Sequence, residues 1–169
     1  SEKGVGTTFV IRVPFKIDLD ADKREEQKDV SENSIKGLHI LLAEDNELNA
    51  EIAIAILEET GLIIDRVEDG IQCVNRIDQM PAGTYDMILM DIQMPVMNGL
   101  EAAQMIRALL REDAHTIPIV AMTANAFSED VSKSLNAGMN DHISKPIDLK
   151  KLHAVLGTYG DRNEKTANE

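Results

Sequence analysis

The sequence has no tryptophan, and aromatic residues make up only 3% of its 169 residues. Hydrophobic residues still amount to 43%, so the core must be built from aliphatic and methionine side chains. The single cysteine, Cys73, excludes a disulfide within the chain and is typical of a reducing compartment, so we expect a cytoplasmic location. Cys73 lies among apolar residues, which predicts a buried thiol.

Positive charge and long hydrophobic runs are also scarce. The 17 Lys and Arg residues are outnumbered by 30 Asp and Glu, which gives a net charge of −13. A chain this acidic offers no basic surface to neutralise phosphates, so we expect no nucleic-acid partner. No apolar run approaches the ~18 residues of a membrane span, and no signal peptide is visible, so we expect no direct membrane contact.

The chain divides into four stretches of different composition. Residues 1–17 combine a glycine-rich start with the alternation of a β-strand. Residues 18–36 are highly charged and poor in apolar residues, which predicts a solvated linker. Regular periodicity extends over 37–157, and 158–169 form a polar tail. Because the first residue is Ser rather than Met, we expect a piece of a larger protein.

The regular stretch alternates five short apolar runs with five segments of helical periodicity. The apolar runs are typical of strands buried on both faces, and they lie at 38–43, 62–67, 85–90, 117–122 and 142–144. Apolar stripes predict a helix after each run. The stripe of the first helix includes Leu48 and Ile52, and that of the third extends to Leu110. Asp148 is the predicted N-cap of the last helix. Such alternation predicts an α/β fold with a parallel sheet covered on both faces.

Polar residues stand where the predicted strands end. Glu44 and Asp45 follow the first strand, Asp91 the third, Thr123 the fourth and Lys145 the fifth. Ligands of open parallel sheets bind outside the carboxyl ends of the strands, so we expect these side chains to converge. Each has an ordinary alternative role, as a helix-terminal anion, a turn residue or a solvent-facing lysine. Their coincidence at four strand ends favours a shared site.

The charges of this set indicate its chemistry. At ~5 Å and an effective dielectric of ~20, two carboxylates repel by about 3 kcal/mol, so three of them require cations. Lys145 supplies one positive charge, and Mg²⁺ suits a few carboxylates with retained waters. A metal beside a lysine and a hydroxyl fits phosphoryl transfer, in which an aspartate such as Asp91 acts as the nucleophile.

Four segments make the sequence resemble the response-regulator receiver domain of two-component phosphorelays. They read LLAEDNELN, DMILMDIQMPVMNG, IPIVAMTANA and MNDHISKPID, all within 37–157. The resemblance implies a flavodoxin-like (βα)5 doubly wound parallel sheet with strand order 2-1-3-4-5. It also implies a monomer whose partner is a histidine-phosphorylated kinase domain or a His-containing phosphotransfer domain.

The same resemblance assigns roles to the residues at the strand ends. Asp91 would accept the phosphoryl group, and Glu44, Asp45 and Asp91 would hold Mg²⁺ or Mn²⁺. The backbone carbonyl of Gln93 would be a further metal ligand. Thr123 would bind one phosphoryl oxygen.

Lys145 would pair with another phosphoryl oxygen, and the Lys145–Pro146 peptide would be cis, as is usual in this family. His142 is a departure, because receivers usually carry Tyr or Phe at this switch position. The alternative for His142 is a structural residue at the rim. The lifetime of the phosphorylated state would depend on Gln93 and Asn125.

The first stretch is similar to the end of a histidine-kinase ATP-binding domain, with Gly4-x-Gly6-Thr7 as its last glycine box. The parent would then be a hybrid sensor kinase, free or membrane-anchored. Without the rest of an ATP site or a phosphorylatable-His motif, the chain is not expected to be a kinase alone, although it would catalyse phosphorylation of its own Asp91.

Two other functions compete with this interpretation. An aspartate-nucleophile phosphatase needs an acid two residues after the nucleophile, where this chain has Gln93. A receiver-like docking module that is never phosphorylated would lack part of the acidic pair, the aspartate or the lysine. All of these are present here.

Overall fold

The computed structural model describes residues 35–124 and 128–160. The predicted strand in 1–17, nearly all of the 18–36 linker, most of the polar tail and Asn125 lie outside the described residues.

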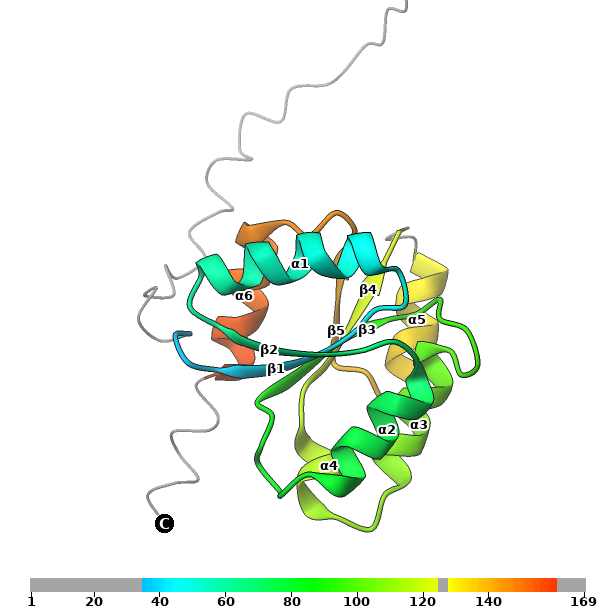
Figure 1. The fold of residues 1–169 in the computed structure, drawn as a ribbon. Coiled ribbons are helices and arrows are strands. Elements are labelled where there is room, and N and C mark those ends of the chain that lie inside the picture. The colour runs from blue at the N-terminus through cyan, green and yellow to red at the C-terminus, as the bar shows by residue number, and fades with distance from the viewer. Residues whose placement is uncertain (1–34, 125–127, 161–169) are drawn as a thin grey trace, which may run out of the picture.

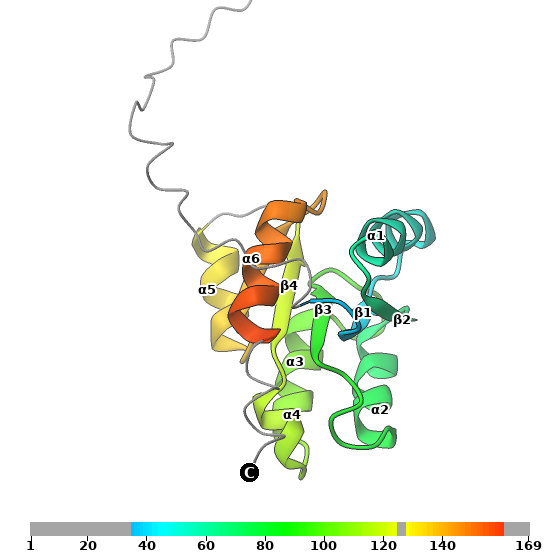
Figure 2. The ribbon, with the colours of Figure 1, turned by 90° about the vertical axis from the view of Figure 1, so that its left-hand side faces the viewer.

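The described residues form a parallel sheet with strand order β2-β1-β3-β4-β5. Figure 2 shows β4, β3, β1 and β2 side by side in this order. This confirms the predicted α/β class and the strand order 2-1-3-4-5. The strands are β1 (His39–Ala43), β2 (Ile63–Val67), β3 (Met87–Asp91), β4 (Ile119–Thr123) and β5 (Asp141–Ser144).

Helices cover both faces of the sheet, as Figure 1 shows for α1 above it and α2 and α3 below it. Side chains from alternate strand positions build two aliphatic cores, one shared with α1 and α6 and the other with α2 and α3. The helices are α1 (Glu47–Glu59), α2 (Gly70–Gln79), α3 (Gly99–Ala108), α4 (Glu112–Thr116), α5 (Ser128–Asn136) and α6 (Leu149–Gly160).

The short helix α4 is an element that the sequence did not predict. The apolar stripe predicted that the helix after β3 would extend to Leu110, but α3 ends at Ala108 and Leu110 is fully exposed. The chain turns here because Leu109 is extended and Arg111 bonds elsewhere, donating to the carbonyl of Met80 at 3.0 Å and pairing with Asp113 at 2.7 Å. The prediction of five helices was therefore wrong, because the described residues contain α4 as a sixth.

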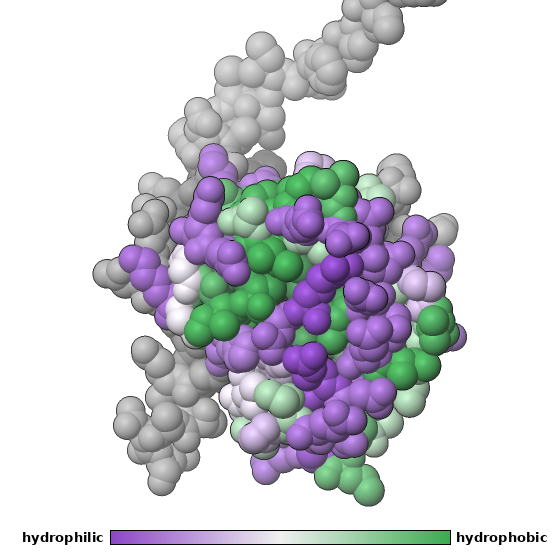
Figure 3. Space-filling view, viewed as in Figure 1, coloured by the Kyte–Doolittle hydropathy of each residue, from purple (hydrophilic) through white to green (hydrophobic). Residues whose placement is uncertain are grey.

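The apolar stripe that predicted α1 is largely not its buried face. Ala50, Ala53 and Leu57 are buried, whereas Leu48 and Ile52 are exposed. Hydrophobic side chains accordingly gather at the surface over α1, at the top of the space-filling view (Figure 3).

Smaller predictions about single residues are also confirmed. Cys73 is fully buried, and burial raises the pKa of its thiol to about 12. Asp148 accepts a hydrogen bond from the backbone N–H of Lys150 at 2.9 Å, as expected for a residue before a helix.

Candidate functional site

The carboxyl ends of four strands bring the predicted residues to one edge of the sheet. Glu44 and Asp45 follow β1, and Lys145 follows β5. Asp91 and Thr123 are the last residues of β3 and β4, so Asp91 belongs to its strand rather than following it. Because Ala43 pairs with Met90, the Asp91 side chain stands one residue beyond the end of β1.

Three carboxylates gather at this edge. Glu44, Asp45 and Asp91 each offer an oxygen atom, and these oxygens all lie within 4.8 Å of one another. Glu44 is 2% exposed and Asp91 is 7% exposed, whereas Asp45 is open to solvent. Two of the three charges are thus held out of water, where repulsion between them is strongest.

Lys145 supplies the balancing charge. Its Nζ lies 2.6 Å from Oδ2 of Asp91 and also donates to Oε2 of Glu44. Burial lowers the pKa of Lys145, but the hydrogen bonds with Asp91 and Glu44 outweigh it and hold the pKa above its ordinary value. The ammonium therefore stays charged at neutral pH and bridges the two buried carboxylates.

The pKa of Asp91 reflects a balance of opposing effects. Burial raises this pKa, while hydrogen bonds from Lys145 and from the backbone N–H of Gln93 at 3.0 Å lower it. The net direction is upward, because desolvation of the carboxylate outweighs these two partners. A further cation in the site would favour the ionised form that a nucleophile needs.

The remaining predicted residues lie on the side of β4 and β5. Thr123 is buried, and its carbonyl accepts a hydrogen bond from the Lys145 N–H at 2.8 Å. The Lys145–Pro146 peptide is cis, as predicted. His142 is half-buried in β5, and its ring lies 3.7 Å from the carboxylate of its neighbour Asp141. Its role as a switch residue stays a prediction.

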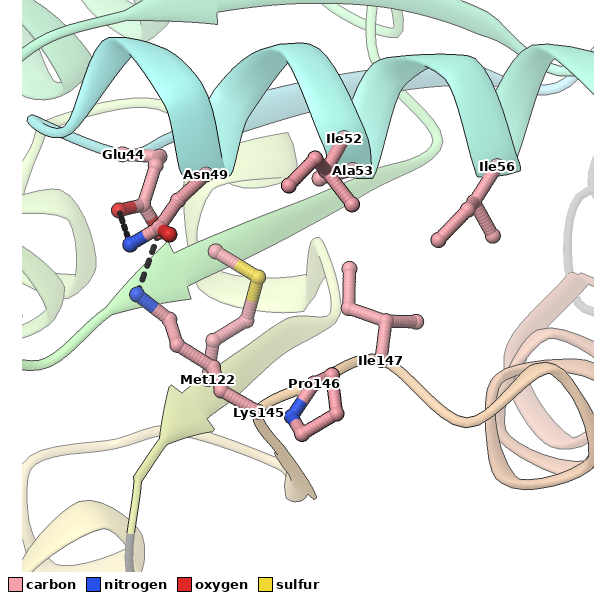
Figure 4. A pocket seen from close by; sticks show the side chains of 9 residues that line it. All are labelled: Glu44, Asn49, Ile52, Ala53, Ile56, Met122, Lys145, Pro146 and Ile147. Atoms are coloured by element: carbon pink, nitrogen blue, oxygen red, sulfur yellow. Dashed lines mark hydrogen bonds and ion pairs between the residues drawn. The ribbon is translucent and has the colours of Figure 1, made fainter.

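Two residues that the sequence analysis did not single out support the acidic pair. Asn49 donates from Nδ2 to Oε1 of Glu44 at 3.1 Å (Figure 4). Arg66 donates to the carbonyls of Glu44 and Asp45 at 3.2 and 3.3 Å. The sequence contained signals for both residues, since Asn49 ends the segment LLAEDNELN, and Arg66, with Asp65, is one of two charged residues in a strand whose other residues are apolar.

The charge and donors of this cluster fit a hard divalent cation. Three carboxylates and one ammonium leave the cluster negative, and its closely spaced oxygens are the ligands that Mg²⁺ prefers. Glu44, Asp45 and Asp91 are the residues that would hold it.

An apolar groove of about 110 Å³ begins beside this cluster and follows α1. Ile52, Ala53 and Ile56 of α1 line one wall, with Pro146 and Ile147 opposite (Figure 4). Glu44, Asn49 and Lys145 lie together at one end of it. The groove therefore joins an exposed hydrophobic surface to the charged site.

Within residues 35–124 and 128–160, none of the helices combines the length and the apolar character needed to cross a bilayer.

Residues 40–157 match the family model described as the response regulator receiver domain. Among curated relatives, BarA of Escherichia coli is 36% identical over 77% of this chain, and ArcB of Escherichia coli is 33% identical over 97% of it. The chain spans 14% of the length of BarA and 20% of that of ArcB. Both are described as sensory or signal-transduction proteins, BarA as a histidine-protein kinase.

Two solved structures bear directly on the site. The receiver domain of a sensor histidine kinase from Pseudomonas aeruginosa, solved with a magnesium ion in its active-site cleft, is 39% identical, with a TM-score of 0.66. The match covers 74% of this chain and 98% of that domain. The receiver domain of Ssk1 from Saccharomyces cerevisiae, solved with the histidine phosphotransfer protein Ypd1, is 28% identical, with a TM-score of 0.66 over 76% of this chain and 92% of that one.

Proposed function

Since this chain belongs to the response regulator receiver domain family, we propose that it accepts a phosphoryl group on Asp91 from a phosphohistidine partner and passes it onward in a phosphorelay. The single observation that carries this proposal is the arrangement around Asp91. Its carboxylate ends a central strand, contacts the Lys145 ammonium at 2.6 Å and shares a cluster with two further carboxylates.

The transfer moves one phosphoryl group between two side chains. A carboxylate oxygen of Asp91 attacks the phosphorus, the P–N bond breaks, and its electron pair stays on the histidine nitrogen. The imidazole, protonated on its other nitrogen, leaves neutral. The Lys145 ammonium exchanges its contact with the Asp91 carboxylate for one with a phosphoryl oxygen. The Thr123 hydroxyl donates a hydrogen bond to another phosphoryl oxygen.

Glu44, Asp45, Asp91 and the backbone carbonyl of Gln93 would hold Mg²⁺, which neutralises charge on the phosphoryl oxygens when bound. The Pseudomonas aeruginosa domain solved with magnesium supports this choice of metal. We infer that Mn²⁺ can take its place, because it also prefers oxygen ligands.

Acetyl phosphate provides the direct test, since it supplies a phosphoryl group without a partner protein. With Mg²⁺, we expect intact-mass spectrometry to find one added phosphoryl group on the wild type and none on Asp91→Asn. Asp86→Asn is the matched control. Asp86 directly precedes β3, at the opposite end of the strand from Asp91, and its carboxylate accepts a hydrogen bond from the backbone N–H of His39. Equal labelling of wild type and Asp91→Asn would refute the proposal.

The groove along α1 is the surface that we propose for the partner's histidine-bearing helix. It is apolar, it follows an exposed helix, and one end of it reaches Glu44 and Lys145. The complex of Ypd1 with the receiver domain of Ssk1 supports a phosphotransfer protein as this partner. A helix laid in the groove would bring its histidine to Asp91.

Ile52→Glu tests this docking surface, with Ile63→Glu as the control. The two isoleucines are 50% and 53% exposed, but Ile63 lies on β2, outside the groove. We expect Ile52→Glu to slow phosphotransfer from a histidine-phosphorylated phosphotransfer protein by roughly tenfold or more, as for other buried interface anchors. Labelling by acetyl phosphate should stay unchanged in both variants, and equal losses in both would contradict the assignment.

We also propose that the parent is a cytoplasmic or membrane-anchored hybrid histidine kinase, with residues 1–17 ending its ATP-binding domain. The similarity to ArcB supports this, because it covers 97% of the chain and therefore includes most of this stretch. Incubating the full-length parent with ATP would test this domain order. We expect phosphate on the kinase and on the receiver of the wild type, and Asp91→Asn should lose only the phosphate on the receiver.

A further inference from the structure

We propose that Arg66 is a positioning residue that holds the Glu44–Asp45 turn in the conformation needed for metal binding. Its side chain donates from Nε to the carbonyl of Glu44 at 3.2 Å and from a terminal nitrogen to the carbonyl of Asp45 at 3.3 Å. The inference rests on the proposed function, because the metal site is the one assigned there.

The backbone explains why this turn needs an added partner. The β1–β2 ladder ends at the pair Ala43 and Val67, and the Glu44 N–H makes the last bond, to the carbonyl of Val67 at 3.1 Å. Helix α1 begins only at Glu47, with Asn46 as its N-cap. The carbonyls of Glu44 and Asp45 thus fall between two regular elements, where the ladder no longer supplies donors.

A guanidinium is suited to this task by its shape. Its planar fork donates in two fixed directions, so one side chain can fix two successive carbonyls. Arg66 is well placed, because it pairs with Leu42 in the ladder and is half-buried against the turn. The carbonyl of Glu44 lies in the peptide plane between Glu44 and Asp45, and the carbonyl of Asp45 lies in the next plane. Holding both planes fixes the backbone on either side of Asp45, and therefore the direction in which its carboxylate leaves the backbone.

The support of Arg66 adds to contacts made on the other side of Glu44. The Glu44 carboxylate already meets Asn49 and Lys145, whereas Asp45 is exposed and Arg66 holds its backbone. Asp45 is therefore the metal-binding residue whose position depends most on Arg66. Groups that orient metal ligands typically change metal affinity by about 10- to 100-fold when they are removed.

A purely electrostatic role for Arg66 predicts the opposite change in metal affinity. If Arg66 acted only as a nearby positive charge, its removal would strengthen the binding of a cation. A positioning role predicts weaker binding, and it predicts that Arg66→Lys also weakens binding, because an ammonium keeps the charge but loses the fork.

The test titrates the unphosphorylated protein with Mn²⁺ and follows free Mn²⁺ by electron paramagnetic resonance. We expect Arg66→Met and Arg66→Lys to raise the dissociation constant about tenfold. Arg76→Met is the control, because it also removes one arginine charge near β2 but contacts Asp65 and Tyr85. Unchanged or tighter Mn²⁺ binding by the Arg66 variants, relative to Arg76→Met, would overturn the inference.

A kinetic measurement separates positioning from general damage. With acetyl phosphate, we expect the Mg²⁺ concentration for half-maximal labelling to rise in both Arg66 variants, while the rate at saturating Mg²⁺ stays within about twofold. A lower saturating rate with an unchanged half-maximal concentration would contradict a positioning role. If Arg66→Met does not fold, Arg66→Lys carries the same test. Failure of the wild type to bind Mn²⁺ or become labelled would instead refute the proposed function.

Discussion

At the scale of single residues, Asp91 meets two opposing demands. It must be buried at the end of a central strand to be held rigidly, but burial raises the pKa of its carboxyl and disfavours the ionised nucleophile. Lys145 and the Gln93 N–H recover part of this cost through hydrogen bonds. The Glu44 carboxylate contacts the same ammonium, so Lys145 bridges two buried carboxylates.

Removing that ammonium should therefore cost stability. We expect Lys145→Ala to lower the free energy of unfolding by about 1 to 3 kcal/mol, because two buried carboxylates lose their cation. Added Mg²⁺ should recover part of this loss, since a cation that binds only the folded state stabilises it. Urea unfolding with and without Mg²⁺ measures both effects.

The matched control for this experiment is Lys150→Ala, which removes an exposed lysine near the start of α6. Its stability should stay within about 0.5 kcal/mol of the wild type. A Lys145→Ala protein as stable as this control would show that the ion pairs do not stabilise the fold.

At the scale of elements, the loop between β3 and α3 carries the backbone strain of the site. Val96 has φ at 67°, a left-handed conformation that is unfavourable for a β-branched residue, and its side chain is mostly exposed. The loop then closes tightly, because a Cβ at Gly99 would lie 2.2 Å from the Asp91 carbonyl oxygen. Asn98 is the N-cap of α3 and forms a capping box with Glu101. Glycine is thus required at position 99, whereas valine at 96 is held there against its preference.

Replacing that valine should stabilise the protein. We expect Val96→Gly to raise the free energy of unfolding by about 1 kcal/mol, because relief of strain exceeds the added chain entropy of glycine. Val96→Thr keeps a β-branched side chain of similar size and should give no gain. Urea midpoints of the two variants decide the matter, and equal midpoints would mean that the loop is not strained at Val96.

At the scale of the whole molecule, the strands and the site could be predicted for one shared reason. Buried parallel strands are continuous apolar runs, so their ends and the polar residues there are visible in the sequence. Asp91, Lys145 and the acidic pair were found in this way. The topology then places those ends together without any further information.

What could not be predicted depends on contacts between distant segments. Arg111, the residue before α4, donates a hydrogen bond across to the carbonyl of Met80 at the end of α2, and no local pattern predicts that bond. Leu48 and Ile52 have the spacing of a core stripe, but small alanines face the sheet instead. Arg66 reaches a turn 21 and 22 residues away, so its role appears only once β1 and β2 are paired.

The most direct test of the account locates the phosphoryl group chemically. Wild-type protein is treated with acetyl phosphate and Mg²⁺, reduced with borohydride to convert an aspartyl phosphate to homoserine, and sequenced by tandem mass spectrometry. We predict homoserine at position 91 and nowhere else, and none when Mg²⁺ is removed by a chelator. Homoserine at position 45 or another aspartate, with position 91 unmodified, would contradict the central claim.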